Sequence, residues 1–276
     1  MVIGIMQGRL VPPSDGRIQC FPREGWQGEF PLAAAAGLAA IEWIYDLHGA
    51  DINPIAADDG LAQIRSLSTG SRVLVRSLCA DYFMDEPLLR TNERQIEERK
   101  QTLVWLLGRC AMLGVSRIVL PFVDSSRIES NGDLGDVVEV LQDVLPVLEE
   151  TGVELHLETS LPPDRFADML ARVPHPMVKV NYDSGNSCSL GYHPIDEFAA
   201  YGARVGSLHI KDRVRGGSTV PLGSGDADFK ALFKCLEDTA YQGDFVLQVA
   251  RGAAGDEVAW ARKNREFVLA LQAGNA

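Results

Sequence analysis

The feature that most constrains the fold is a regular alternation of short apolar runs with longer amphipathic stretches, which continues along the whole chain. The apolar runs have strand length and are rich in branched residues. Eight can be counted, at Val2–Met6, Ala40–Tyr45, Arg72–Leu78, Arg117–Phe122, Val153–Glu158, Met177–Asp183, Ser207–Asp212 and Phe245–Ala250. Helical patterns lie between them, at Arg94–Leu113, Leu134–Glu150, Asp164–Val173 and Phe229–Ala240, and Gly37, Gly114 and Gly152 precede strands as helix ends. Eight strand–helix units predict an α/β fold, the (β/α)₈ TIM barrel.

A doubly wound sheet is the alternative, since it shares the alternation but usually has about five to seven strands. The 276 residues match the roughly 250 of one barrel. No linker rich in Pro or Ser divides the chain. We therefore predict one domain over residues 1–276.

The charge and cysteine content exclude several classes of partner. The chain has 26 Lys and Arg against 38 Asp and Glu, and a net charge of −12 disfavours nucleic acid. Its five scattered cysteines form no C-x-x-C pair, which indicates reduced thiols in a cytoplasmic protein. Val2–Met6 is too short for a signal-peptide core and Phe30–Ile41 is too short to span a bilayer, so no membrane association is expected.

The functional groups of such barrels lie at the carboxyl ends of the strands. Period-two alternation along Val153–Glu158 points Glu154, His156 and Glu158 into the barrel, with Glu158 nearest the mouth. On the last four strands, the inward residues near the mouth are Glu158, Asp183, His209 with Lys211, and Gln248. Four neighbouring strands thus each offer a polar side chain at similar height.

The oxygen and nitrogen donors of Glu158, Asp183 and His209 suit one divalent metal such as Mn²⁺, Zn²⁺, Co²⁺ or Mg²⁺. The alternative for each residue is a polar side chain paired inside the barrel, but three at one end of consecutive strands favour a metal site. His156 lies one layer deeper and is expected to be a hydrogen-bonded core group or a partner of a ligand.

The segment from Lys211 to Gly225 contains three cations and four glycines above the predicted metal site. Lys211 with Arg213 or Arg215 is expected to hold a substrate phosphate or carboxylate, and a flexible loop without a ligand is the alternative. Residues at the ends of the first three strands are candidates for the opposite wall, and these are Gln7, Arg9, Glu42, Trp43, Arg76 and Asp81.

Several motifs resemble the xylose isomerase-like barrel superfamily, and within it the sugar-phosphate isomerases and epimerases related to L-ribulose and L-xylulose 5-phosphate 3-epimerases. The motifs are Gly4-Ile-Met-Gln-Gly-Arg-Leu, Ile41-Glu-Trp, Leu157-Glu158, Tyr182-Asp183-Ser-Gly-Asn186, His209-Ile-Lys-Asp and Val220-Pro-Leu-Gly-Ser-Gly-Asp-Ala-Asp-Phe. The resemblance implies that Glu158, Asp183 and His209 are metal ligands, that Glu158 lies near the reacting carbon, that Asn186 contacts substrate, and that the protein forms homo-oligomers. One position departs from the family pattern, because Gln248 stands where the epimerases carry a second catalytic Glu.

We therefore expect a metal-dependent isomerase or epimerase that abstracts a proton next to the carbonyl of a sugar or sugar phosphate through an enediolate. Glu158 is the predicted base, Lys211 polarises an oxygen or holds the anionic end, and Gln248 completes the metal shell through its amide oxygen. Because Gln248 cannot transfer a proton, isomerisation with one base is favoured over epimerisation. The alternatives are a non-catalytic metal-dependent sugar-binding barrel, or a metal-dependent hydrolase or lyase on this fold.

Overall fold

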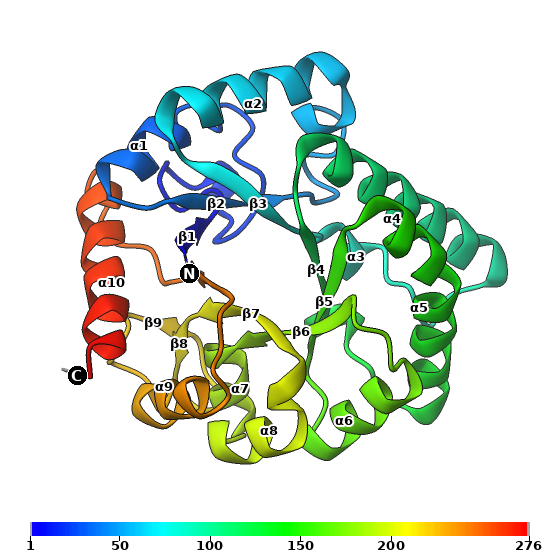
Figure 1. The fold of residues 1–276 in the computed structure, drawn as a ribbon. Coiled ribbons are helices and arrows are strands. Elements are labelled where there is room, and N and C mark those ends of the chain that lie inside the picture. Colours follow the sequence, from blue (N-terminus) through cyan, green and yellow to red (C-terminus); the bar gives the residue numbers. More distant parts are fainter. Residues whose placement is uncertain (1, 275–276) are drawn as a thin grey trace.

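The computed structural model describes residues 2–274, and its eight parallel strands close into one barrel (Figure 1). Each strand pairs with its neighbours in chain order, and the last strand pairs with the first. The barrel strands are β1 (Ile3–Met6), β2 (Ala40–Ile44), β3 (Leu74–Cys79), β4 (Arg117–Phe122), β5 (Glu154–Thr159), β6 (Val178–Asp183), β7 (Val205–Ile210) and β10 (Asp244–Leu247). The predicted TIM barrel is therefore confirmed.

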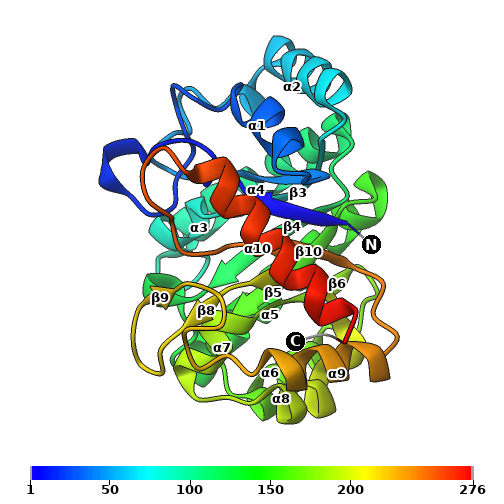
Figure 2. The ribbon, with the colours of Figure 1, turned by 90° about the vertical axis from the view of Figure 1, so that its left-hand side faces the viewer.

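Helices form a ring outside the strands, and α10 crosses the near face in the side view (Figures 1 and 2). The α-helices are α1 (Glu29–Ala35), α2 (Asp58–Ser71), α3 (Tyr82–Asp85), α4 (Glu93–Leu113), α5 (Asn131–Thr151), α6 (Pro163–Arg172), α7 (Ser184–Leu190), α8 (Pro194–Tyr201), α9 (Phe229–Asp238) and α10 (Glu257–Gln272). Short 3₁₀ turns are η1 (Ser14–Gly16), η2 (Pro54–Ala56), η3 (Asp124–Ser126) and η4 (Gly202–Arg204). No helix within residues 2–274 is long and apolar enough to cross a membrane.

The two long helices α4 and α5 show why these segments are helical. Asn92 and Ser130 cap their first turns with side-chain oxygens that accept from backbone N–H groups. Gly114 and Gly152 end them in the left-handed conformation that glycine adopts without strain. Between these caps each helix buries an apolar stripe against the barrel, so local chemistry and packing agree.

Strand pairing differs from the expected runs in ways that matter for the site. The seventh strand ends at Ile210, and Asp212 instead begins a small antiparallel hairpin, β8 (Asp212–Arg213) with β9 (Thr219–Val220). The eighth strand ends at Leu247, so Gln248 lies directly after it. The helix α7 follows β6 without a loop and was not predicted, since seven residues are too few to show a period.

Candidate metal centre and substrate cavity

Glu158, Asp183 and His209 converge at the carboxyl ends of β5, β6 and β7. Each offers one ligand atom, and these atoms lie within 4.8 Å of one another. Nδ1 of His209 lies 3.0 Å from Oε2 of Glu158 and 4.0 Å from Oδ2 of Asp183. All three residues are buried. Strand alternation therefore brings the predicted ligand set together.

The ring of His209 is held in the orientation that a metal ligand needs. Its Nε2 lies 2.6 Å from Oε1 of the buried Glu42, whereas Nδ1 has no hydrogen-bond partner. With Nε2 directed at Glu42, Nδ1 points toward the carboxylates of Glu158 and Asp183, where a metal ion on Nδ1 would take the place of a proton. Metal-bound histidines usually donate their other ring N–H to a carboxylate or carbonyl in this way. The residues present thus fit a divalent ion.

The electrostatics of the cluster favour a cation at this position. Burial by itself lowers the pKa of His209, but the Glu42 and Glu158 carboxylates outweigh it and raise that pKa to about 10. Burial raises the pKa of Glu158, yet His209 and Lys211 hold it below its usual value. Burial raises the pKa of Asp183. Because negative charge surrounds the ring, a proton or a metal ion stabilises this arrangement.

Hydrogen bonds from neighbouring side chains and backbone amides hold the carboxylates of Asp183 and Glu158 in place. Oδ1 of Asp183 accepts from the backbone N–H groups of Gly185 and Asn186 at 2.9 and 2.8 Å, and this caps α7. Glu158 accepts from Asn181 at 2.8 Å and from the side chain of Asn186 at 2.7 Å. The ligands are therefore held in place by the protein itself.

Lys211 brings an ammonium group to the edge of the cluster. Its Nζ lies 3.4 Å from Oδ2 of Asp183, 3.2 Å from Oδ1 of Asn186 and 3.0 Å from Oε1 of Gln248. The side chain passes directly over Gly185, where a Cβ would lie 2.5 Å from Cγ of Lys211. Glycine at position 185 is thus required for this approach.

A cavity of about 470 Å³ opens above the cluster, which is within the usual range for small-molecule sites. Its wall is mostly polar and includes Arg17, Gln19, Asp46, Asp81, Asp85, Asp124, Glu158, Asn186, Lys211, Arg213 and Gln248. Of the expected substrate contacts, Asn186 and Arg213 therefore face the cavity. Arg213 donates to Oδ1 of Asn186 at 2.9 Å.

The loop after β7 is ordered by Asp212, the last residue of the His209-Ile-Lys-Asp motif, for which the sequence predicted no role. The buried carboxylate of Asp212 accepts from the backbone N–H groups of Gly223, Ser224, Gly225 and Ala227. Four acceptor contacts fold the glycine-rich segment back over β8. Arg215 lies against Gly191 and does not line the cavity, so the structure does not bring it to the expected anion site.

Of the six residues predicted for the opposite wall of the site, Asp81 lines the cavity and the other five do not. Glu42 lies beneath His209. Oε1 of Gln7 accepts from the backbone N–H of Ile44 at 2.9 Å, and the residue is buried. Arg9 is also buried, and it donates to the carbonyl of Val249 and to Gln19.

Trp43 and Arg76 lie away from the mouth. Trp43 is fully buried and packs against Phe21, Trp26 and Phe30 outside the barrel, as alternation requires once Glu42 points inward. The register of β2 with β3 skips Arg76, whose Nε lies 3.5 Å from Asp244 at the opposite end of the barrel. Neither residue reaches the substrate cavity.

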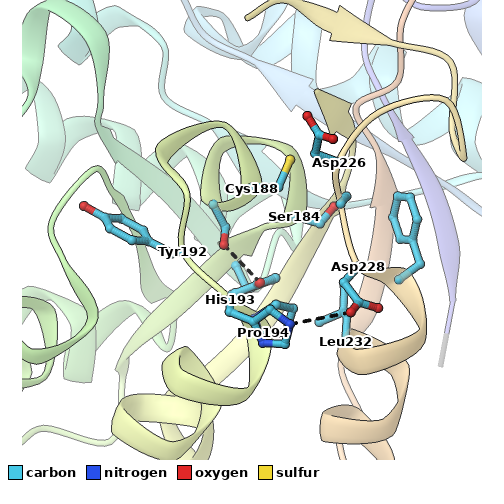
Figure 3. A pocket seen from close by; sticks show the side chains of 12 residues that line it. Ser184, Cys188, Tyr192, His193, Pro194, Asp226, Asp228 and Leu232 are labelled. Atoms are coloured by element: carbon cyan, nitrogen blue, oxygen red, sulfur yellow. Dashed lines mark hydrogen bonds and ion pairs between the residues drawn. The ribbon is translucent and has the colours of Figure 1, made fainter. Parts of the chain in front are cut away.

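A second cavity lies between α7, α8 and the start of α9 (Figure 3). His193 and Asp228 face one another there at 3.5 Å, and Cys188 and Ser184 line it from α7. Its volume of about 30 Å³ accommodates water but not a sugar ring. The larger cavity above Glu158 is therefore the candidate substrate site.

The closed barrel of eight parallel strands, with a candidate metal-ligand cluster at its mouth, places the chain in the class of TIM barrels. The family model of the xylose isomerase-like TIM barrel matches residues 30–271. The chain belongs to this family.

Individual relatives are distant. An inosose dehydratase of Clostridium perfringens is 23% identical over 172 residues, which are 54% of this chain and 58% of that protein. A solved structure of IOLI protein with a bound zinc atom superposes with a TM-score of 0.78 at 17% identity, covering 98% of each chain. D-psicose 3-epimerase from Clostridium cellulolyticum H10, solved with D-tagatose, gives 0.74 at 17% identity and covers 99% of each chain. These likenesses establish the shared fold.

Proposed function

We propose that this protein is a metal-dependent sugar isomerase that moves a proton between adjacent carbons of a sugar or sugar phosphate. The observation that carries the proposal is the cluster of Glu158, Asp183 and His209, in which Nδ1 of His209 makes no hydrogen bond and Glu158 lines a 470 Å³ cavity. Family membership and the solved epimerase with this fold support it.

Glu158 is the proposed base. Its carboxylate is kept in the basic form because His209 and Lys211 lower its pKa against the effect of burial. Asn181 and Asn186 hold its two oxygens, so the direction of proton removal is set in advance. A divalent ion held by Glu158, Asp183 and His209 would supply the Lewis acidity that polarises the substrate carbonyl.

Gln248 determines which proton transfer is favoured. An amide neither takes nor gives a proton at neutral pH, so position 248 supplies no second acid or base. Epimerisation at one carbon needs proton-transferring groups on both faces, whereas isomerisation returns the proton on the same face. Glu158 by itself is sufficient for isomerisation.

The direct test is solvent exchange followed by NMR. With Mn²⁺ and a panel of ketoses and ketose phosphates in deuterated water, the protein should place deuterium on the carbon beside the carbonyl. Glu158→Gln should abolish exchange, whereas Glu154→Gln, on the same strand face at the opposite end of the barrel, should retain it. Metal binding without exchange for any sugar would instead identify a non-catalytic sugar-binding barrel.

The charged side of the cavity suggests an anionic substrate end. Lys211 and Arg213 both line it, whereas Arg215 turns toward Gly191. Arg213→Met should weaken binding of a phosphorylated sugar by about 1.5–3 kcal/mol, the size of a charge-assisted hydrogen bond. Arg215→Met is the matched control and should change KM little. Equal KM values of the natural protein for plain and phosphorylated sugar would contradict this assignment.

Dehydration of a hydroxy ketone is a second candidate, favoured by the likeness to inosose dehydratase. It shares the first step, in which a base removes the proton next to the carbonyl, but hydroxide then leaves the adjacent carbon and departs as water. The same NMR experiment separates the two reactions, because isomerisation yields an isomeric sugar and dehydration an unsaturated ketone.

A further inference from the structure

A chain of hydrogen bonds crosses the mouth of the barrel from Lys211 to Asp81. Lys211 donates to Oε1 of Gln248 at 3.0 Å, and Nε2 of Gln248 donates to Oε1 of Gln19 at 3.1 Å. Nε2 of Gln19 then donates to Oδ2 of Asp81 at 2.8 Å. The loop after β1, which carries Gln19, thereby connects the ends of β3, β10 and β7.

The direction of this chain is set at the Gln19 amide. Arg9 has only donors, and its guanidinium lies 3.0 Å from Oε1 of Gln19, so this atom must be the carbonyl oxygen. Burial raises the pKa of Asp81 to about 6, so at neutral pH its carboxylate mainly accepts and requires the NH₂ group of Gln19. Turning the amide over would oppose donor to donor and acceptor to acceptor.

The fixed amide of Gln19 determines what position 248 must offer. A side chain there has to donate toward Oε1 of Gln19 and accept from Lys211. Glutamine does both, whereas an ionised glutamate only accepts. The loop residue therefore explains why an amide stands at position 248.

We propose that Gln19 is a positioning residue of the active site, which acts through Gln248 to hold the Lys211 ammonium beside Asp183 and Asn186. Gln19 and Gln248 form a matched pair, in which the orientation of the first selects an amide at the second. This proposal rests on the proposed function, because it gives Lys211 a place in that reaction.

The first test is a double-mutant cycle on turnover. Gln19→Met and Gln248→Met should each lower kcat by about 10- to 100-fold with a smaller change in KM, since the reacting groups are misplaced. The double variant should be no worse than the poorer single variant, because the second change interrupts a chain already broken. Gln101→Met, on the exposed side of α4, is the matched control and should match the natural protein. An unchanged kcat for Gln19→Met, or losses that multiply, overturns the proposal.

Gln248→Glu adds a sharper comparison. The new carboxylate would face Oε1 of Gln19, and the two oxygens would repel each other. Met at position 19 removes that oxygen. Gln248→Glu should therefore reduce kcat more in the natural background than in the Gln19→Met background. An equal loss in both backgrounds rejects the matched pair.

A readout without turnover separates the two proposals. Urea unfolding midpoints of the natural protein, the two Met variants and the double variant should be non-additive if Gln19 and Gln248 are coupled. If no sugar is turned over, the proposed function fails. The coupling of Gln19 and Gln248 is then judged from unfolding alone, and additive changes in the unfolding midpoint would reject it.

Discussion

Two buried histidines lie inside the barrel at different depths, and their surroundings differ. Both ring nitrogens of the deeper His156 have partners, with Nδ1 2.7 Å from Oγ of Ser207 and Nε2 2.9 Å from Glu154. His209, nearer the mouth, makes one hydrogen bond, between Nε2 and Glu42, while its Nδ1 faces the carboxylate of Glu158 at 3.0 Å. Both side chains are fully buried, so a ring nitrogen that faces carboxylates without making a hydrogen bond distinguishes a candidate ligand from a structural histidine.

The charges around the two histidines also differ. At the deeper end Glu154 is paired with Lys179 at 2.7 Å, and Asp244 with Arg117 at 3.1 Å. Near the mouth, the carboxylates of Glu42, Glu158 and Asp183 surround His209, and Lys211 forms an ion pair with Asp183 at 3.4 Å. A surplus of negative charge in a buried space is stabilised by a bound cation.

The two layers are nevertheless connected. Oγ of Ser207, the partner of His156, donates to Oδ1 of Asn181 at 2.7 Å. Asn181 then donates to Glu158 at 2.8 Å. The deeper layer thus supports the carboxylate proposed as the base, which lies in the upper one.

The largest expected effect separates the histidines by metal content. His209→Ala and Asp183→Ala should each reduce the bound divalent metal from about one ion per chain to near zero. Two remaining protein ligands are too few to hold the ion. His156→Ala should retain the metal. Elemental analysis of the purified variants measures this. Full occupancy in the His209 and Asp183 variants would contradict the proposed centre.

A smaller effect is expected where a side chain acts on the metal through His209. Glu42→Gln keeps an acceptor for Nε2 but removes the charge, and such changes behind a ligand usually weaken metal binding about 10- to 100-fold. Competition with a chelator of known affinity measures the change. Glu154→Gln, which removes the carboxylate beside His156, is the control and should leave metal affinity unaltered.

The smallest effect concerns the hydroxyl that connects the layers. Ser207→Ala should lower the free energy of unfolding by about 1–2 kcal/mol, since two buried polar atoms lose a partner. Urea unfolding of the metal-free protein gives this value, and metal affinity should change much less than in Glu42→Gln. An equal loss of metal affinity would show that the deeper layer belongs to the metal centre.

Strand alternation was sufficient to predict the barrel and to bring Glu158, Asp183 and His209 to one end of it. It failed for Arg76, because the register of β2 with β3 skips this residue and sends its side chain to the other end of the barrel. Arg215 was placed over the site from composition, but the fold of its loop turns it against Gly191. Loop residues have no period, so Gln19 left no signal.

The sequence by itself determined which elements form and which strand residues share a face, because period and end signals are local. Tertiary structure decided the rest. The proton pattern of His209 depends on Glu42, which is 167 positions away, and the amide of Gln248 is oriented by Gln19, which is 229 positions away. Hydrogen-bond direction and pKa are set by atoms within a few ångströms in space, and only the closed barrel brings those atoms together.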